Sequence, residues 1–334
     1  RANITAKIAK NLTARLNLSY NSDKQEKFPM AGREHVETWR ILITWQPYKP
    51  LYIEGKPLKV WLGNQSNVIL HSGYWIRKKN TINAQMRLKY EVPFLKGLSV
   101  EGSYNNEAYN ADTDIFNHKN TEWLIEGNIG ADWSQVRLTG ETKLSKAPPR
   151  DYLSKNAAKS QSYQFNIQAK YNQSFNKHNI DGFLVYEQWE LAQSNFGGTR
   201  YDFPIILKDQ FFASSDAAED SQFNGNEFED GRLSWIGQAN YSYDSKYYLS
   251  ASFRYDGSIV FSPDYRWGLF PSVSGAWVLS EESFFDSGKI QYLKLRASLG
   301  MLGNDNIGRW RWLENYNASN GFYFGEAPVQ TKGI

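Results

Sequence analysis

Carboxylate and amide side chains are concentrated between Gln193 and Gly231, a polar stretch that the sequence predicts to be the longest loop of the chain. The oxygen-bearing residues in it are Asp216, Glu219, Asp220, Asn224, Asn226, Glu227, Glu229 and Asp230. Oxygen ligands of this kind suit Ca²⁺, which is a hard cation. Their spacing does not follow the EF-hand loop, so a solvated acidic loop is the main alternative to a calcium site.

Aromatic side chains occur in the same stretch and indicate a binding role. They are Phe196, Tyr201, Phe203, Phe211, Phe212, Phe223 and Phe228. On a free loop they would form an unusually large exposed apolar patch. We therefore expect an interface with a partner protein. Stacking faces for sugar rings, and packing of the loop onto its own chain, are the alternatives.

Catalytic chemistry has little support elsewhere in the chain. The sequence has no Gly-x-Ser-x-Gly elbow, no His-Glu-x-x-His and no Walker loop. Ser174 and Lys177 satisfy Ser-x-x-Lys, but the companion motifs of that chemistry are absent. The four histidines lie far apart, and the lack of cysteine excludes thiolate metal sites and disulfides. We expect a non-enzyme with no cofactor, apart from the candidate calcium.

Composition excludes several further classes. The 334 residues include 38 Lys and Arg against 35 Asp and Glu, with no basic tract, so a nucleic-acid partner is not expected. No run approaches the roughly 18 apolar residues of a membrane-spanning helix. Aromatic residues make up 16% of the chain, which is far too many for a disordered protein.

Alternation of polar and apolar residues is the strongest local pattern. Between Ser162 and Asn172, the odd positions are aromatic or aliphatic and the even positions are polar. The same pattern recurs at 12–20, 82–90, 136–140, 235–243, 249–255 and 293–301. Because strand side chains point alternately to opposite faces, the sequence predicts an all-β chain whose strands each have one apolar and one polar face.

Three features favour an antiparallel transmembrane β-barrel over a water-soluble sandwich. The alternating runs are about 10 residues long, aromatic residues cluster at their ends, and short connections alternate with long polar ones. The long connections are expected at 21–35, 108–120, 146–159, 193–231 and 257–266. Short periplasmic turns and long extracellular loops are typical of such barrels. The polar residues expected on the inner wall are Arg15, Arg87, Lys89, Arg137, Glu141, Arg254 and Arg296.

One segment interrupts the pattern. A strand is expected at Val36–Gln46, and the next clear strand comes only after residues that include Pro47, Pro50 and Pro57. If both strands descend, the chain has to climb back between them. Part of Leu58–Ile76 is therefore expected to cross the membrane or to run inside the lumen.

The region from Tyr243 to Asn304 resembles a known family. The matching residues are Arg254, Asp256, Gly257, Ser258, Trp267, Gly268, Phe270, Pro271, Trp277, Leu293, Lys294, Leu295 and Arg296. In this order they resemble the barrel of SusC/RagA-type TonB-dependent outer-membrane transporters. The family pattern commonly continues with Ser-Arg-Phe where this sequence has Ile259-Val260-Phe261, so this loop is expected to differ locally.

The resemblance implies a barrel of roughly 22 strands closed by an N-terminal plug. It also implies import of oligosaccharide or oligopeptide across the bacterial outer membrane, energised through TonB, with a SusD-like surface lipoprotein as a lid. We expect residues 1–334 to form part of this barrel within outer-membrane lipid, and the plug, the closing strands and the TonB-contacting segment to lie outside the chain. The alternative is a soluble β-rich glycan-binding or adhesin module.

Overall fold

The computed structural model describes residues 1–29, 43, 50–59, 64–127, 136–145, 148–285, 288, 290–308, 311–313, 317–323 and 328–333. One antiparallel sheet of ten strands dominates this part of the chain, in the order β1-β2-β5-β6-β9-β10-β11-β12-β13-β14. The strands are β1 (Ala2–Ala9), β2 (Leu12–Lys27), β5 (Gly73–Glu91), β6 (Leu98–Asn117), β9 (Tyr152–Phe175), β10 (His178–Tyr201), β11 (Ser221–Tyr243), β12 (Tyr247–Ser258), β13 (Trp267–Val278) and β14 (Lys294–Gly300).

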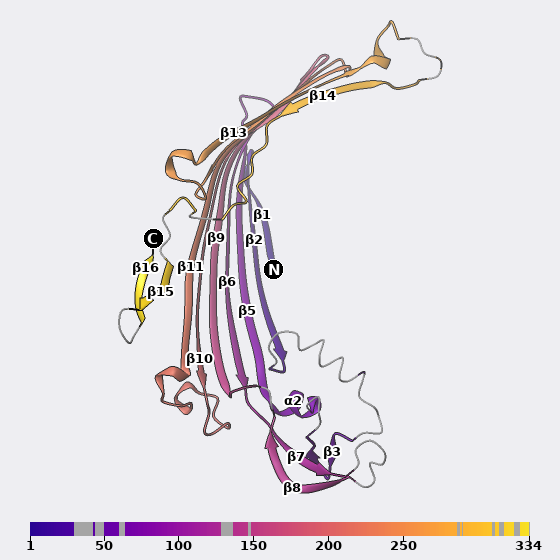
Figure 1. Cartoon of the computed structure of the whole chain (residues 1–334). Helices are drawn as coiled ribbons and strands as arrows, with labels where there is room; N and C mark the ends of the chain where they lie inside the picture. Colours follow the sequence, from indigo (N-terminus) through magenta and orange to yellow (C-terminus); the bar gives the residue numbers. More distant parts are fainter. Residues whose placement is uncertain are drawn as a thin grey trace.

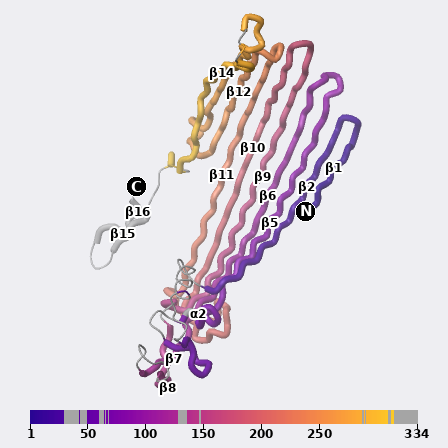
Figure 2. Tube along the Cα trace, turned by 90° about the vertical axis from the view of Figure 1, so that its right-hand side faces the viewer, coloured from indigo at the N-terminus to yellow at the C-terminus, as the bar shows by residue number. Residues whose placement is uncertain are grey.

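Short elements gather at one end of this sheet. Tight turns join the strands at one end, and α2, β7 and β8 lie at the other (Figures 1 and 2). We call these the turn end and the loop end. The short elements are β3 (Tyr52–Ile53), β4 (Lys56–Pro57), α2 (Gln65–His71), β7 (Thr121–Glu126) and β8 (Arg137–Leu144). A further hairpin joins β15 (Asn317–Tyr323) to β16 (Pro328–Gly333). None of the described helices is long and apolar enough to cross a membrane.

Register gives the sheet one apolar face. Residues directly opposite on neighbouring strands share a face, so a row can be followed across the sheet. One such row is Ala14–Leu88–Gly102–Ile167–Tyr186–Trp235–Tyr255–Leu269. Ile167, Trp235 and Leu269 remain 45%, 41% and 54% exposed, so no described residue covers this face.

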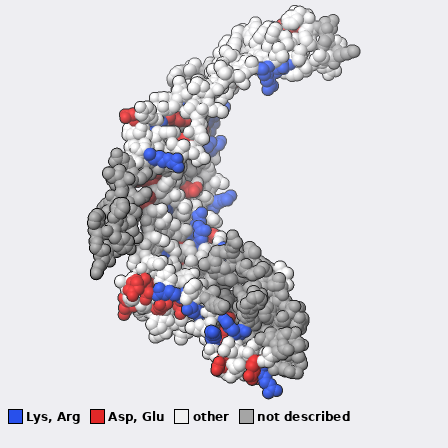
Figure 3. Space-filling model, in the orientation of Figure 1, with Lys and Arg blue, Asp and Glu red and all other residues white. Residues whose placement is uncertain are grey.

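The opposite face is polar. One row on it is Arg15–Arg87–Ser103–Asn166–Glu187–Ser234–Asp256. The sheet curves into a trough (Figure 1), and Lys and Arg side chains stand along its hollow side (Figure 3). Apolar residues outside and polar residues inside a curved antiparallel sheet are the arrangement of a transmembrane barrel wall. A soluble sandwich would instead bury its apolar rows against a second layer.

The apolar band covers only the turn-proximal part of the strands. On β2 it runs from Leu12 to Tyr20, and on β5 from Ile82 to Tyr90. Eight steps of about 3.4 Å, tilted by about 40°, give roughly 21 Å of height, close to the apolar belt of an outer-membrane barrel. Beyond the band the strands continue with polar residues on both faces, such as Asn110 and Lys159 on the outer side.

The sheet order corrects the expectation for the interrupted segment. Strand β2 pairs directly with β5 along its whole length, so no strand lies between them. Part of Leu58–Ile76 forms α2 at the loop end, not a membrane crossing. Asn64 precedes α2, and its Oδ1 accepts a hydrogen bond from the Asn67 backbone N–H at 3.1 Å, which caps the helix. Val36–Gln46, expected as a strand, lies outside the described residues apart from position 43.

A small core holds the loop end together. Phe116, Leu153 and Phe203 are buried and pack against one another, with Tyr74 at their edge. Gly73 permits this packing because its φ is +110° and a Cβ there would lie 2.1 Å from the Phe116 carbonyl oxygen. This cluster is the described part's clearest apolar interior, and it lies beyond the membrane band.

Candidate transport wall and loop-end interface

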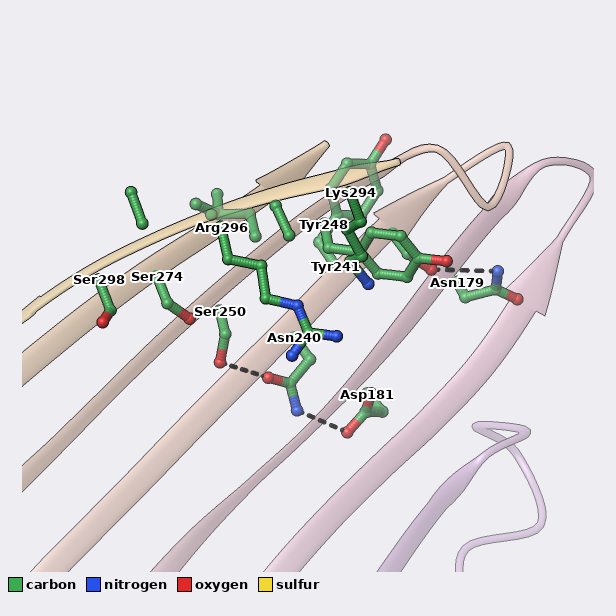
Figure 4. Close-up of a pocket in the computed structure, with 15 residues that line it drawn as sticks. Asn179, Asp181, Asn240, Tyr241, Tyr248, Ser250, Ser274, Lys294, Arg296 and Ser298 are labelled. Atoms are coloured by element: carbon green, nitrogen blue, oxygen red, sulfur yellow. Dashed lines mark hydrogen bonds between the residues drawn. The ribbon is translucent and has the colours of Figure 1, made fainter. Parts of the chain in front are cut away.

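A hollow of about 690 Å³ lies on the polar face, across β10 to β14 near the turn end. Amide and hydroxyl groups line it, with one carboxylate and two cations: Asn179, Asp181, Asn240, Ser242, Ser250, Ser274, Ser298, Lys294 and Arg296. Asn240 Nδ2 donates to Asp181 Oδ2 at 3.0 Å, and Ser250 Oγ donates to Asn240 Oδ1. Their polar ends project from the same side of the strands (Figure 4). Such a wall offers many donors and acceptors to a polar, weakly charged molecule.

The other half of the polar face is basic. A second hollow, of about 510 Å³, is lined by Arg15, Arg87, Lys89 and Lys170, with Glu91 and Glu101 as the only carboxylates. Arg87 Nε lies 3.3 Å from Glu101 Oε1, and Lys89 Nζ lies 3.1 Å from Glu91 Oε1. Four cations against two carboxylates leave this half positive, so an anionic group facing it would be attracted.

Two residues expected on the inner wall lie elsewhere. Arg137 and Glu141 are on β8, which pairs only with β7 in a separate two-stranded sheet at the loop end. The expectation was wrong because alternation reports that a strand has two faces but not which sheet it joins. The structure places Arg15, Arg87, Lys89, Arg254 and Arg296 on the polar face of the main sheet.

The stretch from Gln193 to Gly231 is not one long loop. Strand β10 continues to Tyr201 and β11 begins at Ser221, so the connection comprises residues 202–220. Phe196 and Tyr201 lie on β10, whereas Asn224, Asn226, Glu227, Glu229, Asp230, Phe223 and Phe228 lie on β11. Only Phe203, Phe211, Phe212, Asp216, Glu219 and Asp220 belong to the connection.

The candidate calcium ligands are not brought together. Alternation along β11 puts Asn224, Asn226 and Asp230 on one face and Glu227 and Glu229 on the other. Within the described residues, no three His, Asp or Glu side chains are grouped as a metal site would require. The arrangement of these side chains therefore gives the calcium expectation no support.

Asp220 has a different role, because it helps to fix the connection. Arg150 donates to Asp220 and also forms a bidentate pair with Asp202. A hydrogen bond from Ser215, and then the Arg150 guanidinium, hold the pKa of the Asp220 carboxyl below its usual value. Tyr74 Oη donates to Asp209 Oδ2 at 2.6 Å. These contacts tie the connection to β5 and to the start of β9.

The aromatic residues of this region divide into core and surface. Phe203 belongs to the buried loop-end cluster, so it does not form an interface. Phe212 is 80% exposed, and Leu207, which the sequence analysis missed, is 90% exposed. The run Pro204-Ile205-Ile206-Leu207 inside a polar connection was the available signal. Phe196 and Phe223 are exposed on the outer side of β10 and β11. We call Phe196, Ile205, Leu207, Phe212 and Phe223 the loop-end apolar residues.

The family-motif residues have structural roles in strands β12 to β14. Arg254 Nε pairs with Asp256 Oδ2 at 3.0 Å along β12. Gly257 lies under the Trp267 indole, Gly268 lies under the Phe270 ring, and Ser258 Oγ accepts from the Val260 N–H. Trp277 Nε1 donates a hydrogen bond to Glu282 Oε1 at 3.0 Å, and Lys294 Nζ lies over the Tyr248 ring, 3.9 Å from its centroid. Two backbone hydrogen bonds involve Pro271 and Leu293, whose carbonyls accept from the Met301 N–H and the Ser280 N–H, respectively. Leu295 and Arg296 alternate between the apolar and polar faces of β14.

Known proteins share both the sequence pattern and the fold. TonB-dependent receptor SusC of Bacteroides thetaiotaomicron is 25% identical over 285 residues, which cover 78% of this chain and 26% of SusC. TonB-dependent receptor P39 of Formosa agariphila is 33% identical over 171 residues, which cover 48% of this chain and 16% of P39. No protein-family model matches the chain.

The RagAB peptide importer in its closed-closed state has a chain that superposes over 99% of this one with a TM-score of 0.72, at 18% identity. The match covers 35% of that chain. The resemblance to SusC/RagA-type TonB-dependent transporters is confirmed. The ten-stranded sheet is thus part of the wall of an antiparallel outer-membrane barrel, and the chain spans about a quarter or less of the curated relatives named here.

Proposed function

We propose that this chain forms one side of the barrel of an outer-membrane transporter that imports oligosaccharides or oligopeptides, energised through TonB. The two-faced sheet carries the proposal, because apolar rows suit lipid and the polar hollow side suits a wet lumen. The names of SusC and of the RagAB peptide importer agree with nutrient import by proteins of this fold. In this proposal the chain moves cargo and catalyses no reaction.

The polar wall is the surface that passing cargo would meet. The hollow across β10 to β14 offers hydroxyl and amide groups, to which both sugar hydroxyls and peptide groups can hydrogen-bond. The wall therefore favours a polar oligomer with little net charge over an apolar molecule. The wall does not discriminate between a glycan and a peptide, because both offer hydrogen-bonding groups to it.

A surface lipoprotein of the SusD kind would cover the loop end in this proposal. The loop-end apolar residues supply a contact surface for it, since apolar side chains this exposed at the end of a barrel wall mark protein interaction sites. Co-purification with the full-length transporter and the lipoprotein encoded beside it tests the contact. The double substitution Leu207→Ser and Phe212→Ser should weaken it at least about 30-fold, the equivalent of about 2 kcal/mol. Phe94→Ser, at an equally exposed residue in a turn at the opposite end, should leave it unchanged.

Import itself is tested in cells that carry the full-length transporter. The cells receive a mixture of oligosaccharides and oligopeptides, and mass spectrometry follows which species disappear from the medium. Selective depletion of one class that stops when TonB is deleted supports the proposal. Depletion of neither class, or depletion that continues without TonB, would contradict it.

Two matched variants test the wall. Asn240→Ala removes an amide that hydrogen-bonds to Asp181 and Ser250 on the hollow side, and it should slow depletion of the selected cargo. Asn106→Ala removes an amide from the outer side of β6, and it should not. Equal effects of the two variants would show that the hollow side is not the cargo path.

A further inference from the structure

A groove of about 580 Å³ lies on the outer face of the sheet, where the apolar band ends. Two glycines form its floor, because Gly231 and Gly257 present no side chain on this face. Trp267 lies beside Gly257 on β13, and Glu190 lies beside Gly231 on β10. The β12–β13 connection closes one side, where the Ile259 backbone N–H donates to the Gly231 carbonyl at 3.2 Å.

An aromatic platform borders the groove on its membrane side. The Trp267 indole covers Gly257 so closely that a Cβ there would lie 3.0 Å from the ring. The indole also stacks on Tyr255, with ring centroids 4.7 Å apart at 21°. It nevertheless remains 45% exposed, so one face is free to contact an occupant. A rigid, half-exposed indole beside polar groups is suited to the apolar face of a sugar ring.

Polar groups stand on the opposite side of the groove. Gln188 Nε2 donates to Tyr163 Oη at 2.9 Å and to Glu190 Oε1 at 2.8 Å, which fixes the amide and the carboxylate relative to each other. Glu229 is exposed one row further from the membrane. Two arginines also line the groove: Arg232, which pairs with Asp305 at 2.9 Å, and Arg266, which donates to the Phe261 carbonyl at 3.3 Å. Carboxylates accept hydrogen bonds from sugar hydroxyls and repel phosphate.

The position of the groove selects an amphiphilic occupant. Toward the turn end lie the apolar rows that contain Tyr186, Trp235 and Tyr255, which suit hydrocarbon chains. Cargo in the lumen meets the other face of the sheet. We propose that the groove binds an outer-leaflet lipid with an uncharged saccharide headgroup, whose sugar lies between Trp267 and Glu190 and whose acyl chains lie along the apolar rows.

The experiment uses the full-length transporter in nanodiscs of phosphatidylethanolamine and phosphatidylglycerol that contain a small fraction of glucosyl diacylglycerol. Native mass spectrometry counts the lipids that the protein keeps on release from the disc. Among the lipids bound to the released protein, the fraction of glucosyl diacylglycerol should be about tenfold higher than its fraction in the disc. The fraction of phosphatidylglycerol should not be higher than in the disc. A free disaccharide of glucose at millimolar concentration should not displace the glycolipid, because the free sugar lacks acyl chains.

Three variants link retention to the groove. Glu190→Gln and Trp267→Ala should each abolish most of the enrichment, while Trp267→Phe should keep part of it. Glu187→Gln, a carboxylate three residues away on the hollow face, should leave it unchanged. Heat-modifiable migration on gels verifies that each variant folds. Enrichment of phosphatidylglycerol instead, no enrichment of either lipid, displacement by the free sugar, or enrichment unaffected by Glu190→Gln and Trp267→Ala would each overturn the proposal.

Discussion

An arginine placed on the apolar face of β10 would test the assignment of the two faces. Leu184 lies near the middle of the apolar band and is 44% exposed, and Val185 follows it on the hollow face. An arginine at the bilayer midplane of a β-barrel costs about 2–4 kcal/mol, whereas one facing a wet lumen costs much less. Leu184→Arg should therefore reduce the folding equilibrium constant by about 30-fold to 1000-fold, and Val185→Arg by less than about 5-fold.

The assay is guanidinium unfolding of the full-length barrel in lipid vesicles. The free energy of unfolding of each variant is compared with that of the unmodified barrel, with the same m-value used for both. The pair Ala251→Arg and Ser252→Arg on β12 repeats the comparison, because these neighbours also face opposite sides. A larger penalty at Val185 and Ser252 than at Leu184 and Ala251 would reverse the inside and outside of the sheet. Equal penalties at all four positions would refute a membrane-facing side altogether.

Other predictions concern turns and the loop end. Gly97→Ala should destabilise the barrel by about 1–3 kcal/mol, measured from gel-shift melting, because its φ is +92° and the new Cβ would lie 2.2 Å from the Asn172 carbonyl oxygen. Gly102→Ala, with open space around it, is the control and should be nearly neutral. The pKa of Asp220 is below its usual value in the folded state. The contribution of this carboxylate to the stability of the folded connection is therefore present above about pH 4 and is lost as the pH falls further. Hydrogen-exchange protection of residues 202–220, corrected for intrinsic rates, should fall accordingly in acid, and Arg150→Gln should lower it already at pH 7. Phe203→Ala should lower that protection more than Phe212→Ala, because only Phe203 is buried.

The membrane-embedded half of the sheet was predictable from the sequence. Where one side of a strand meets lipid and the other meets water, selection on the two faces differs and alternation is strong, as in the run around Ile167. The predicted runs at 12–20, 82–90, 162–172, 235–243 and 249–255 all lie in strands of the ten-stranded sheet. The all-β class followed from this pattern alone.

The distal half of the same strands was mistaken for loops. Residues 21–27, 108–117, 152–159 and 193–201 were expected in connections, yet they continue β2, β6, β9 and β10. In these parts the outer face is polar as well, as at Asn110 and Lys159, so the pattern that predicts a strand disappears where the lipid ends. Hydrogen bonding between neighbouring strands, which a single sequence does not display, maintains the extended conformation there.

The prediction of one long loop from Gln193 to Gly231 was wrong for a related reason. A loop can gather its side chains at one point, whereas a strand sends alternate side chains to opposite faces. Once Asn224 to Asp230 proved to be strand, the candidate calcium ligands were necessarily divided. The separation of Phe203 from Phe212 depended on packing against Phe116 and Leu153, residues that are distant in sequence.

The length of the strands determines where the loop-end apolar residues stand. On β9 the apolar band ends at Tyr163, eleven positions after the strand begins at Tyr152. At about 3.3 Å per residue and a tilt of about 40°, this part rises roughly 28 Å beyond the lipid. The pairing of β9 with β6 and β10 is continuous over this height, so the extension is a rigid wall. Phe212 and Leu207 therefore lie well clear of the membrane band, at the end where the lipoprotein of our proposal would bind.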